Sequence, residues 1–248
     1  MAPHILITGG SRGIGAATAR LAAQLGYAVS INYRHDRTAA EAVTADIVKE
    51  GGSAKVFPAD ISSETEVKHL FASAHAAFGP ITALVNNAGM LSSQMRVDQM
   101  DAARLQQIFS TNVIGSFLCA AEAVRRMSTR HGGNGGAIVN LSSIAASLGS
   151  PGEFVDYAAT KGAIDTLTIG LAKEVAAEGI RVNAVRPGLI YTDIHASAGE
   201  PQRVDRMKSG VPMQRGGEAI EVARAILWLL STEASYITGT LLDVAGGR

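Results

Sequence analysis

Short apolar runs rich in β-branched residues alternate with longer, more polar segments along the whole chain. Seven such runs are candidate strands, at residues 4–8, 28–33, 53–57, 83–86, 137–141, 180–185 and 241–244. Between them apolar residues recur at helical spacing, as at Ala17, Leu21 and Leu25, which share one helical face. This alternation predicts an α/β fold, a doubly wound seven-stranded parallel sheet with helices on both faces.

Two sequence patterns predict where helices begin. Thr38 with Glu41, and Ser63 with Glu66, fit the capping box S/T-x-x-E, in which side chains satisfy the free N–H groups of a first helical turn. Asp36, just before the first pair, is assigned to the preceding turn. Helices are therefore expected to follow both pairs.

No linker, repeat or low-complexity segment divides the chain, so we expect residues 1–248 to form a single domain. The longest stretch without a clear period, residues 189–215, contains Pro201, Gly210 and Pro212. Because long loops in compact domains are usually functional, this stretch is expected to be a mobile substrate flap.

Composition narrows the function classes. Hydrophobic residues make up 47% of the 248 residues, and 22 basic side chains balance 22 acidic ones, which indicates a compact protein. This balance argues against a nucleic-acid arm or a polybasic membrane patch. No stretch has the apolar length of a membrane span, and the first residues lack the basic start of a signal peptide, so a cytoplasmic protein is expected. Its partners should be small molecules or its own copies.

Cysteine and histidine point to neither disulfides nor metals. Cys119 is alone, so no internal disulfide can form, and its place in an apolar segment predicts packing. The six histidines show no metal-ligand spacing, so no metal is expected. The 27 glycines, in contrast, imply many tight turns or close approaches of the backbone to a ligand.

The glycine-rich stretch TGGSRGIG, residues 8–15, lies between the first strand and the first helix. In that position glycines let the backbone approach a pyrophosphate, which the free N–H groups of the helix N-terminus attract. Gly9 to Gly13 also match the G-x-S-x-G nucleophile elbow of serine hydrolases. That class needs an oxyanion-hole loop from an earlier strand, and only eight residues precede Gly9, so the hydrolase is the weaker interpretation.

Tyr157 and Lys161 lie on one face of a helix that is expected to start after an N-cap at Asp156 and to run to about Glu178. An ammonium group so close favours the phenolate, and a Tyr with a lowered pKa is a usable acid or base near neutral pH. Taken alone, a Tyr-x-x-x-Lys pattern more often belongs to a solvent-exposed helix face with no function.

Further polar residues follow strand ends. The run from Gly136 to Ser143 is a buried strand that ends in two hydroxyls, at the edge where open α/β sheets bind ligands. The sequence NNAG, residues 86–89, ends the fourth strand, and Asn112 lies near a helix start. Turn and capping chemistry explains each of these alone.

Together, these motifs resemble those of the short-chain dehydrogenase/reductase family over the whole chain. The resemblance rests on TGGSRGIG, Ala59 with Asp60, NNAG, Asn112, Ser143, Tyr157-x-x-x-Lys161, and Pro187 with Gly188 followed by Thr192. It implies a Rossmann fold and an oxidoreductase that interconverts a carbonyl and a secondary alcohol. In that family the cofactor carries the hydride, and the protein supplies orientation and proton transfer.

The resemblance also implies a role for each site residue. Tyr157 is the implied general acid/base, and Ser143 polarises the substrate oxygen. Lys161 lowers the Tyr157 pKa and holds the nicotinamide ribose, while Asn112 positions a proton-relay water. Asp60 would accept from the adenine amine. The implied cofactor-binding residues are Gly9, Ser11, Arg12, Gly13, Ile14, Gly15, Tyr33, Arg34, Asp60, Ile61, Asn87, Ala88, Gly89, Tyr157, Lys161, Pro187, Gly188, Ile190 and Thr192.

One spacing departs from the family. Ser143 and Tyr157 are 14 positions apart, one more than is common, and residues 151–153 fill the connection. We expect the extra residue to reshape the substrate rim, where Glu153 and Phe154 should lie.

The end of the second strand bears on which cofactor binds. An acidic residue there would accept from the ribose 2′-OH of NAD, but this chain has Tyr33 followed by Arg34. Asp36 lies near the expected number of residues beyond Gly15 for such an acid, but it is assigned to the turn before the next helix. Basic residues at the places of Arg12 and Arg34 clamp the 2′-phosphate in NADP-preferring relatives, so the resemblance favours NADP(H) over NAD(H).

The sequence does not name the substrate beyond a small carbonyl or alcohol. Similarity to 3-oxoacyl-carrier-protein reductases and to sugar dehydrogenases is about equal, and Arg203, Arg206 and Lys208 either meet an acidic carrier protein or form a solvated face. A nucleotide-binding sensor without turnover is the non-enzymatic alternative, although such relatives usually lose the Tyr or the Lys. The family usually forms tetramers, so a homotetramer is expected, with apolar surface from residues 219–230 and 241–244.

Overall fold

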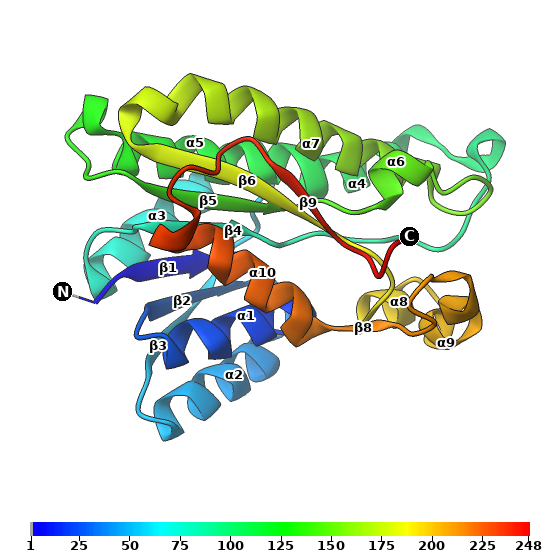
Figure 1. The fold of residues 1–248 in the computed structure, drawn as a ribbon, viewed down its shortest axis with the longest axis horizontal. Helices are drawn as coiled ribbons and strands as arrows, with labels where there is room; N and C mark the ends of the chain where they lie inside the picture. The colour runs from blue at the N-terminus through cyan, green and yellow to red at the C-terminus, as the bar shows by residue number, and fades with distance from the viewer. Residues whose placement is uncertain (1) are drawn as a thin grey trace.

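Seven parallel strands form the central sheet, in the order β3-β2-β1-β4-β5-β6-β9 (Figure 1). The strands are β1 (His4–Ile7), β2 (Ala28–Tyr33), β3 (Ser53–Pro58), β4 (Ala83–Asn86), β5 (Gly136–Leu141), β6 (Ile180–Pro187) and β9 (Leu241–Val244). The computed structural model describes residues 2–248. Every predicted strand is present, with its bounds shifted by at most two residues.

Helices connect the strands and lie against the sheet. They are α1 (Gly13–Gln24), α2 (Arg37–Lys49), α3 (Glu64–Phe78), α4 (Ala102–Phe109), α5 (Gly115–Met127), α6 (Ala145–Leu148), α7 (Val155–Val175), α8 (Ile194–Ser197), α9 (Arg203–Met207) and α10 (Ala219–Leu230). Single 3₁₀ turns lie at Val97–Gln99, Thr129–His131, Ala176–Glu178, Lys208–Gly210 and Thr232–Ala234. Within residues 2–248, no helix combines the length and apolarity needed to cross a membrane.

Both faces of the sheet are buried, each against its own layer of helices. Ile5 and Ile7 of β1 belong to the apolar cluster under α1, α2 and α10, whereas Leu6 belongs to the cluster under α3, α5 and α7. All three side chains are fully buried, as the alternation of strand side chains between two covered faces requires. Cys119 packs in the second cluster, as predicted, and burial raises the pKa of its thiol to about 12.

The two predicted capping boxes have different outcomes. Ser63 caps α3 as predicted, with its Oγ accepting from Glu66 N. The Glu66 carboxylate accepts from Asp60 N, so the second half of the predicted box does not form. The box at Thr38 is wrong, because α2 already begins at Arg37 and the Asp36 carboxylate caps it, accepting from Ala39 N at 2.9 Å. A cap two residues earlier in the chain therefore takes the place of the predicted one.

The prediction that residues 189–215 lack regular structure is wrong. The segment contains α8, α9 and the strand β7 (Ile190–Tyr191), which pairs with β8 (Gly217–Glu218). These elements have only two to five residues each, too few to show a period in the sequence. In Figure 1 the segment, yellow to orange, lies beyond the carboxyl ends of the main strands.

Candidate active site

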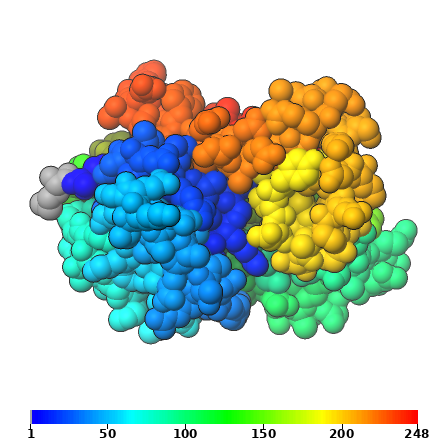
Figure 2. Space-filling view, turned by 90° about the horizontal axis from the view of Figure 1, so that it is seen from below, coloured from blue at the N-terminus to red at the C-terminus, as the bar shows by residue number. Residues whose placement is uncertain are grey.

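A cleft of about 810 Å³ runs along the carboxyl ends of the strands. Figure 2 shows the hollow between the blue N-terminal part of the chain and the yellow-to-orange segment opposite. Of the cofactor-binding residues implied by the sequence, all except Gly15 line this cleft, and so do Ser143, Tyr157 and Lys161. Asn112 is buried behind the cleft wall.

The glycine-rich turn after β1 is held by the end of β4. Asn87 Nδ2 donates to the carbonyl oxygens of Thr8 and Gly9, at 2.8 and 2.9 Å. Gly9 has a φ of +61°, which favours glycine. A Cβ on Gly15 would lie 2.5 Å from Gly9 O and 2.6 Å from Asn87 Nδ2, so Gly15 serves close packing behind the turn. The NNAG and TGGSRGIG motifs thus form one unit, with the N-terminus of α1 at the cleft.

Tyr157 and Lys161 lie at the buried end of the cleft. Burial raises the pKa of Tyr157 to about 12, opposed by a hydrogen bond from the Ser143 hydroxyl. Burial lowers the pKa of Lys161 to about 8, and its Nζ donates to Leu141 O at 2.6 Å. The Nζ lies 5.5 Å from the Tyr157 ring centroid. The expected lowering of the Tyr157 pKa is therefore wrong for the protein by itself, because burial outweighs the nearby groups.

The two serines after β5 have different surroundings. The Ser143 Oγ accepts from Ala145 N at 3.1 Å, at the start of α6, and faces Tyr157. The Ser142 hydroxyl is buried and donates to Lys161 O at 3.1 Å. Ser143 is therefore the serine whose hydroxyl lies beside the Tyr157 side chain. The Ser142 hydroxyl instead bonds the backbone of Lys161.

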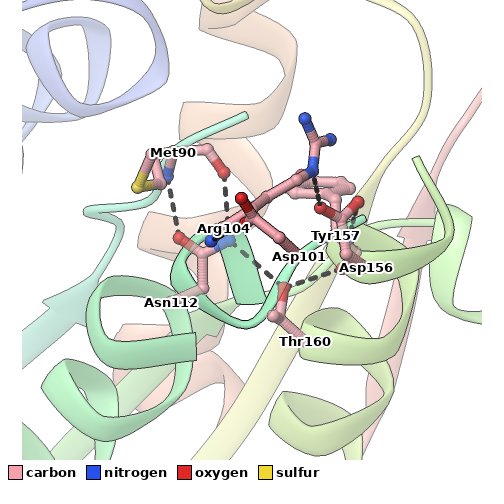
Figure 3. A network of polar contacts seen from close by, with 7 residues as sticks. All are labelled: Met90, Asp101, Arg104, Asn112, Asp156, Tyr157 and Thr160. Carbon is pink, nitrogen blue, oxygen red and sulfur yellow. Dashed lines mark hydrogen bonds and ion pairs between the residues drawn. The ribbon is translucent and has the colours of Figure 1, made fainter. Parts of the chain in front are cut away.

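Asn112 lies three residues before the start of α5, near a helix start as expected. It is part of a π-helical turn, Ser110–Ile114, between α4 and α5. Its side chain joins two segments: Oδ1 accepts from Met90 N at 2.8 Å, and Nδ2 donates to Met90 O at 3.0 Å and Thr160 Oγ1 at 3.2 Å (Figure 3). Thr160 Oγ1 in turn donates to Tyr157 O at 2.7 Å. Asn112 is therefore tied to the first turns of α7.

Asp156 is also not the helix cap that the sequence predicts. The helix α7 begins at Val155, with Phe154 at the N-cap position. Asp156 is fully buried: its Oδ1 accepts from Tyr157 N at 2.9 Å and its Oδ2 from Arg104 Nε at 2.7 Å (Figure 3). The local pattern did not indicate Arg104, because its partner is 52 residues away. This ion pair ties the start of α7 to α4.

The opposite end of the cleft holds the charged residues near the second strand. Arg34 Nη2 lies 2.9 Å from Asp60 Oδ2, and Ser62 donates to Asp60 Oδ1 through its N and Oγ. Burial would raise the pKa of Asp60, but the Ser62 hydrogen bonds and the Arg34 charge together lower it. Tyr33 is buried, and its ring packs in the core. Arg12, in extended conformation before α1, is exposed beside the cleft.

The rim near Tyr157 contains Glu153 and Phe154, as expected from the longer spacing. Arg203 of α9 reaches both of them and also lines the cleft. The other flap cations are paired too: Arg206 contacts Glu200 at 2.7 Å, and Lys208 contacts Asp205 at 2.8 Å. All three cations are therefore paired within the chain, which favours the solvated face over the carrier-docking surface.

Comparisons with known proteins agree with this geometry. A sequence model described as enoyl-(acyl carrier protein) reductase matches residues 9–248. The chain is 60% identical over 243 residues to "Uncharacterized oxidoreductase YgfF" of Escherichia coli K12, covering 98% of both chains. It is 36% identical over 242 residues to the 3-oxoacyl-[acyl-carrier-protein] reductase FabG of Staphylococcus epidermidis, covering 98% of this chain and 97% of the relative. The crystal structure of the Brucella melitensis 3-ketoacyl-(acyl-carrier-protein) reductase complexed with NADH matches with a TM-score of 0.91 at 32% identity, covering 99% of this chain and 98% of that one.

A doubly wound sheet whose glycine-rich first turn and Tyr-x-x-x-Lys helix face one cleft defines a class of oxidoreductases. The chain belongs to the short-chain dehydrogenase/reductase family. It is an oxidoreductase, and the serine hydrolase interpretation of Gly9 to Gly13 is wrong.

The ion pair between Arg104 and Asp156 yields a stability prediction. Arg104→Met leaves a buried carboxylate unpaired, so the free energy of unfolding should fall by about 3 kcal/mol, within the range for breaking a buried pair. Chemical denaturation at fixed protein concentration measures this. Arg96→Met is the control: Arg96 pairs with Asp98 on the surface, so stability should not change. Equal losses in both variants would contradict the prediction.

Proposed function

We propose that this protein is an NADP(H)-dependent oxidoreductase that interconverts a carbonyl and a secondary alcohol, with Tyr157 as general acid/base. The observation that carries the proposal is the convergence of Ser143, Tyr157 and Lys161 on the buried end of one cleft. The related Brucella melitensis reductase is complexed with NADH in its crystal structure, which supports a nicotinamide cofactor.

The cleft residues fit a dinucleotide. Gly9 and Gly13 have positive φ, and the turn brings the N-terminus of α1 to the cleft, where its N–H groups can bind a pyrophosphate. A Cβ on Gly89 would lie 3.6 Å from Lys161 Nζ and 3.5 Å from Asn112 Oδ1, so glycine keeps the space beside both groups open. When bound, a nicotinamide cofactor gives or takes the hydride.

The chain's own residues handle the proton. Because burial holds the Tyr157 pKa at about 12, the phenol stays protonated at neutral pH, which is the form that donates to a carbonyl oxygen during reduction. Ser143 donates to the same oxygen and so stabilises the charge that develops there. The Lys161 ammonium, beside the Tyr157 ring, stabilises the phenolate left behind. The relay water expected at Asn112 has no support here, because that side chain is buried and already bonds Met90 and Thr160.

Replacing Tyr157 tests its role directly. Tyr157→Phe should keep the fold and NADPH binding but lose at least ~10²-fold in turnover, the usual size of a general acid/base contribution. Steady-state absorbance of NADPH measures this. Tyr236→Phe removes the same hydroxyl from a fully exposed position and is the control. Near-normal turnover in Tyr157→Phe would refute the assignment.

The preference for NADP(H) rests on the charges at the adenine end. Arg12 and Arg34 both line the cleft, Arg12 just before α1 and Arg34 just after β2. The Asp36 Oδ1 caps α2, and the Asp60 carboxylate is paired with Arg34. Both acids thus already have partners within the chain, and the two arginines are the groups that we propose favour a 2′-phosphate.

Removing the clamp should change the cofactor preference. Arg12→Ala should weaken NADPH binding about tenfold or more, since a charge-assisted hydrogen bond contributes ~1.5–3 kcal/mol, and should change NADH binding little. Adding Arg34→Asp should reverse the preference, because a carboxylate repels the phosphate but accepts from a free 2′-OH. Fluorescence titration measures both affinities.

Arg37→Ala is the matched control for the clamp. Arg37 lies three positions beyond Arg34, does not line the cleft and pairs with Glu41, so its loss should leave both affinities unchanged. If the unaltered protein binds NADH as tightly as NADPH, the clamp is wrong.

We also propose that the protein is a homotetramer built on its long helices. Ile226, Leu229 and Leu230 of α10 are buried within the chain. Trp228, on the same helix, leaves 40% of its surface exposed. Ile114 and Phe117 leave 49% of their surface exposed along the π-helical turn and α5. Exposed apolar side chains this large on one helical segment are typical of subunit contacts.

Light scattering tests the assembly. The unaltered protein at micromolar concentration should have the mass of a tetramer, and Phe117→Glu should lower it, because a charge at an apolar interface is costly to bury. Val48→Glu changes an equally exposed apolar residue on α2 and should leave the mass unchanged. A monomeric mass for the unaltered protein would end this proposal.

A further inference from the structure

An ion pair crosses the mouth of the cleft beside Tyr157. Arg203 opens α9, in the segment 189–215, and its Nη2 donates to Glu153 Oε2, in the connection that carries the extra residue before α7. The same guanidinium lies 4.9 Å from the centroid of the Phe154 ring. The Arg203 side chain is only 9% exposed. Its charge and cation–π interactions are therefore stronger than they would be in water.

Glu153 also holds a third segment. Its backbone carbonyl accepts from Met95 N at 2.9 Å, and its Oε1 accepts from Gln94 Nε2 at 3.3 Å. One residue therefore joins the loop after β4, the connection before α7 and the segment that contains α9.

The three joined segments supply the apolar wall of the cleft beside Tyr157. Leu91, Phe154 and Ile194, one from each segment, line the cleft there and pack with Ala198 and Tyr157 in one apolar cluster. We call this end of the cleft, next to the ion pair, the apolar chamber.

We propose that Glu153 and Arg203 form a latch that closes the substrate end of the cleft and restricts the reaction to compact, largely apolar ketones. The proposal rests on the proposed function, since it names the substrate class of the same site. A ketone with a long chain would have to pass the latch, whereas a compact ketone fits the covered space. A sugar would bring several hydroxyls into the apolar chamber without partners, which is unfavourable.

The latch can be opened without unpairing Arg203. Arg203 Nη1 also contacts Glu200 Oε2 at 3.0 Å, within the same segment, so it keeps one carboxylate partner when Glu153 is replaced. Glu153→Gln therefore removes the charge of the link across the cleft, and its single amide oxygen can serve only one of the two donors, Arg203 and Gln94, that Glu153 holds. Glu200→Gln is the matched control, because it removes an equal charge from Arg203 and leaves that link in place.

Activity with a ketone series tests the latch. We would measure kcat/KM with NADPH for cyclohexanone and for 2-alkanones from 2-butanone to 2-decanone. The unaltered protein should prefer the compact ketones at least ~10-fold over 2-decanone. Glu153→Gln and Arg203→Met should shift this ratio at least ~10-fold towards the long chain, through KM rather than kcat, with NADPH affinity unchanged. Arg203→Lys should retain most of the preference, and Glu200→Gln all of it.

Hydrogen exchange provides a readout that does not depend on turnover. Amides of residues 194–207 should exchange at least ~10-fold faster in Glu153→Gln than in the unaltered protein or in Glu200→Gln. Unchanged exchange in Glu153→Gln overturns the latch even if ketones are reduced. An unchanged ratio of kcat/KM values overturns its role in specificity. If exchange changes but no carbonyl is reduced at all, the latch stands as a closure and the proposed function fails.

Discussion

The burial of both faces of the parallel sheet is the constraint on which the site depends. Because helices cover both faces, most strand side chains are used in two cores. Side chains can meet a ligand only at the last residues of a strand or beyond them. Ser11 lies in the turn after β1, Asn87 follows β4 and Ser143 lies just after β5, so the topology brings three distant segments to one edge.

Sequence alone predicts those parts of the molecule that local patterns encode. The strands were found because burial on both faces demands continuous apolar runs, as in β1 and β5. The turn after β1 and the pair Tyr157 and Lys161 were found because their residue types and spacing are local. The place of Glu153 at the rim also followed from one extra residue in a connection.

The remaining features depend on tertiary contacts that no local pattern carries. Arg104 neutralises Asp156 from another helix, and the sequence offered only a helix cap for that carboxylate. The spacing of Tyr157 and Lys161 suggested a lowered pKa for Tyr157, but burial determines its pKa, and that burial comes from segments far apart in the chain. At Asp36 and Thr38 two acceptable caps compete within one turn, and only the structure distinguishes them.

On helix α4, two neighbouring residues face opposite ways, Arg104 towards the protein interior and Leu105 towards solvent. Arg104 points inward to Asp156, which holds the backbone of Tyr157, while Leu105 leaves 38% of its surface exposed. A rigid helix cannot shift one of these residues without the other. Two contacts, through Arg104 and Asp156, therefore join the outer surface of α4 to the backbone of Tyr157.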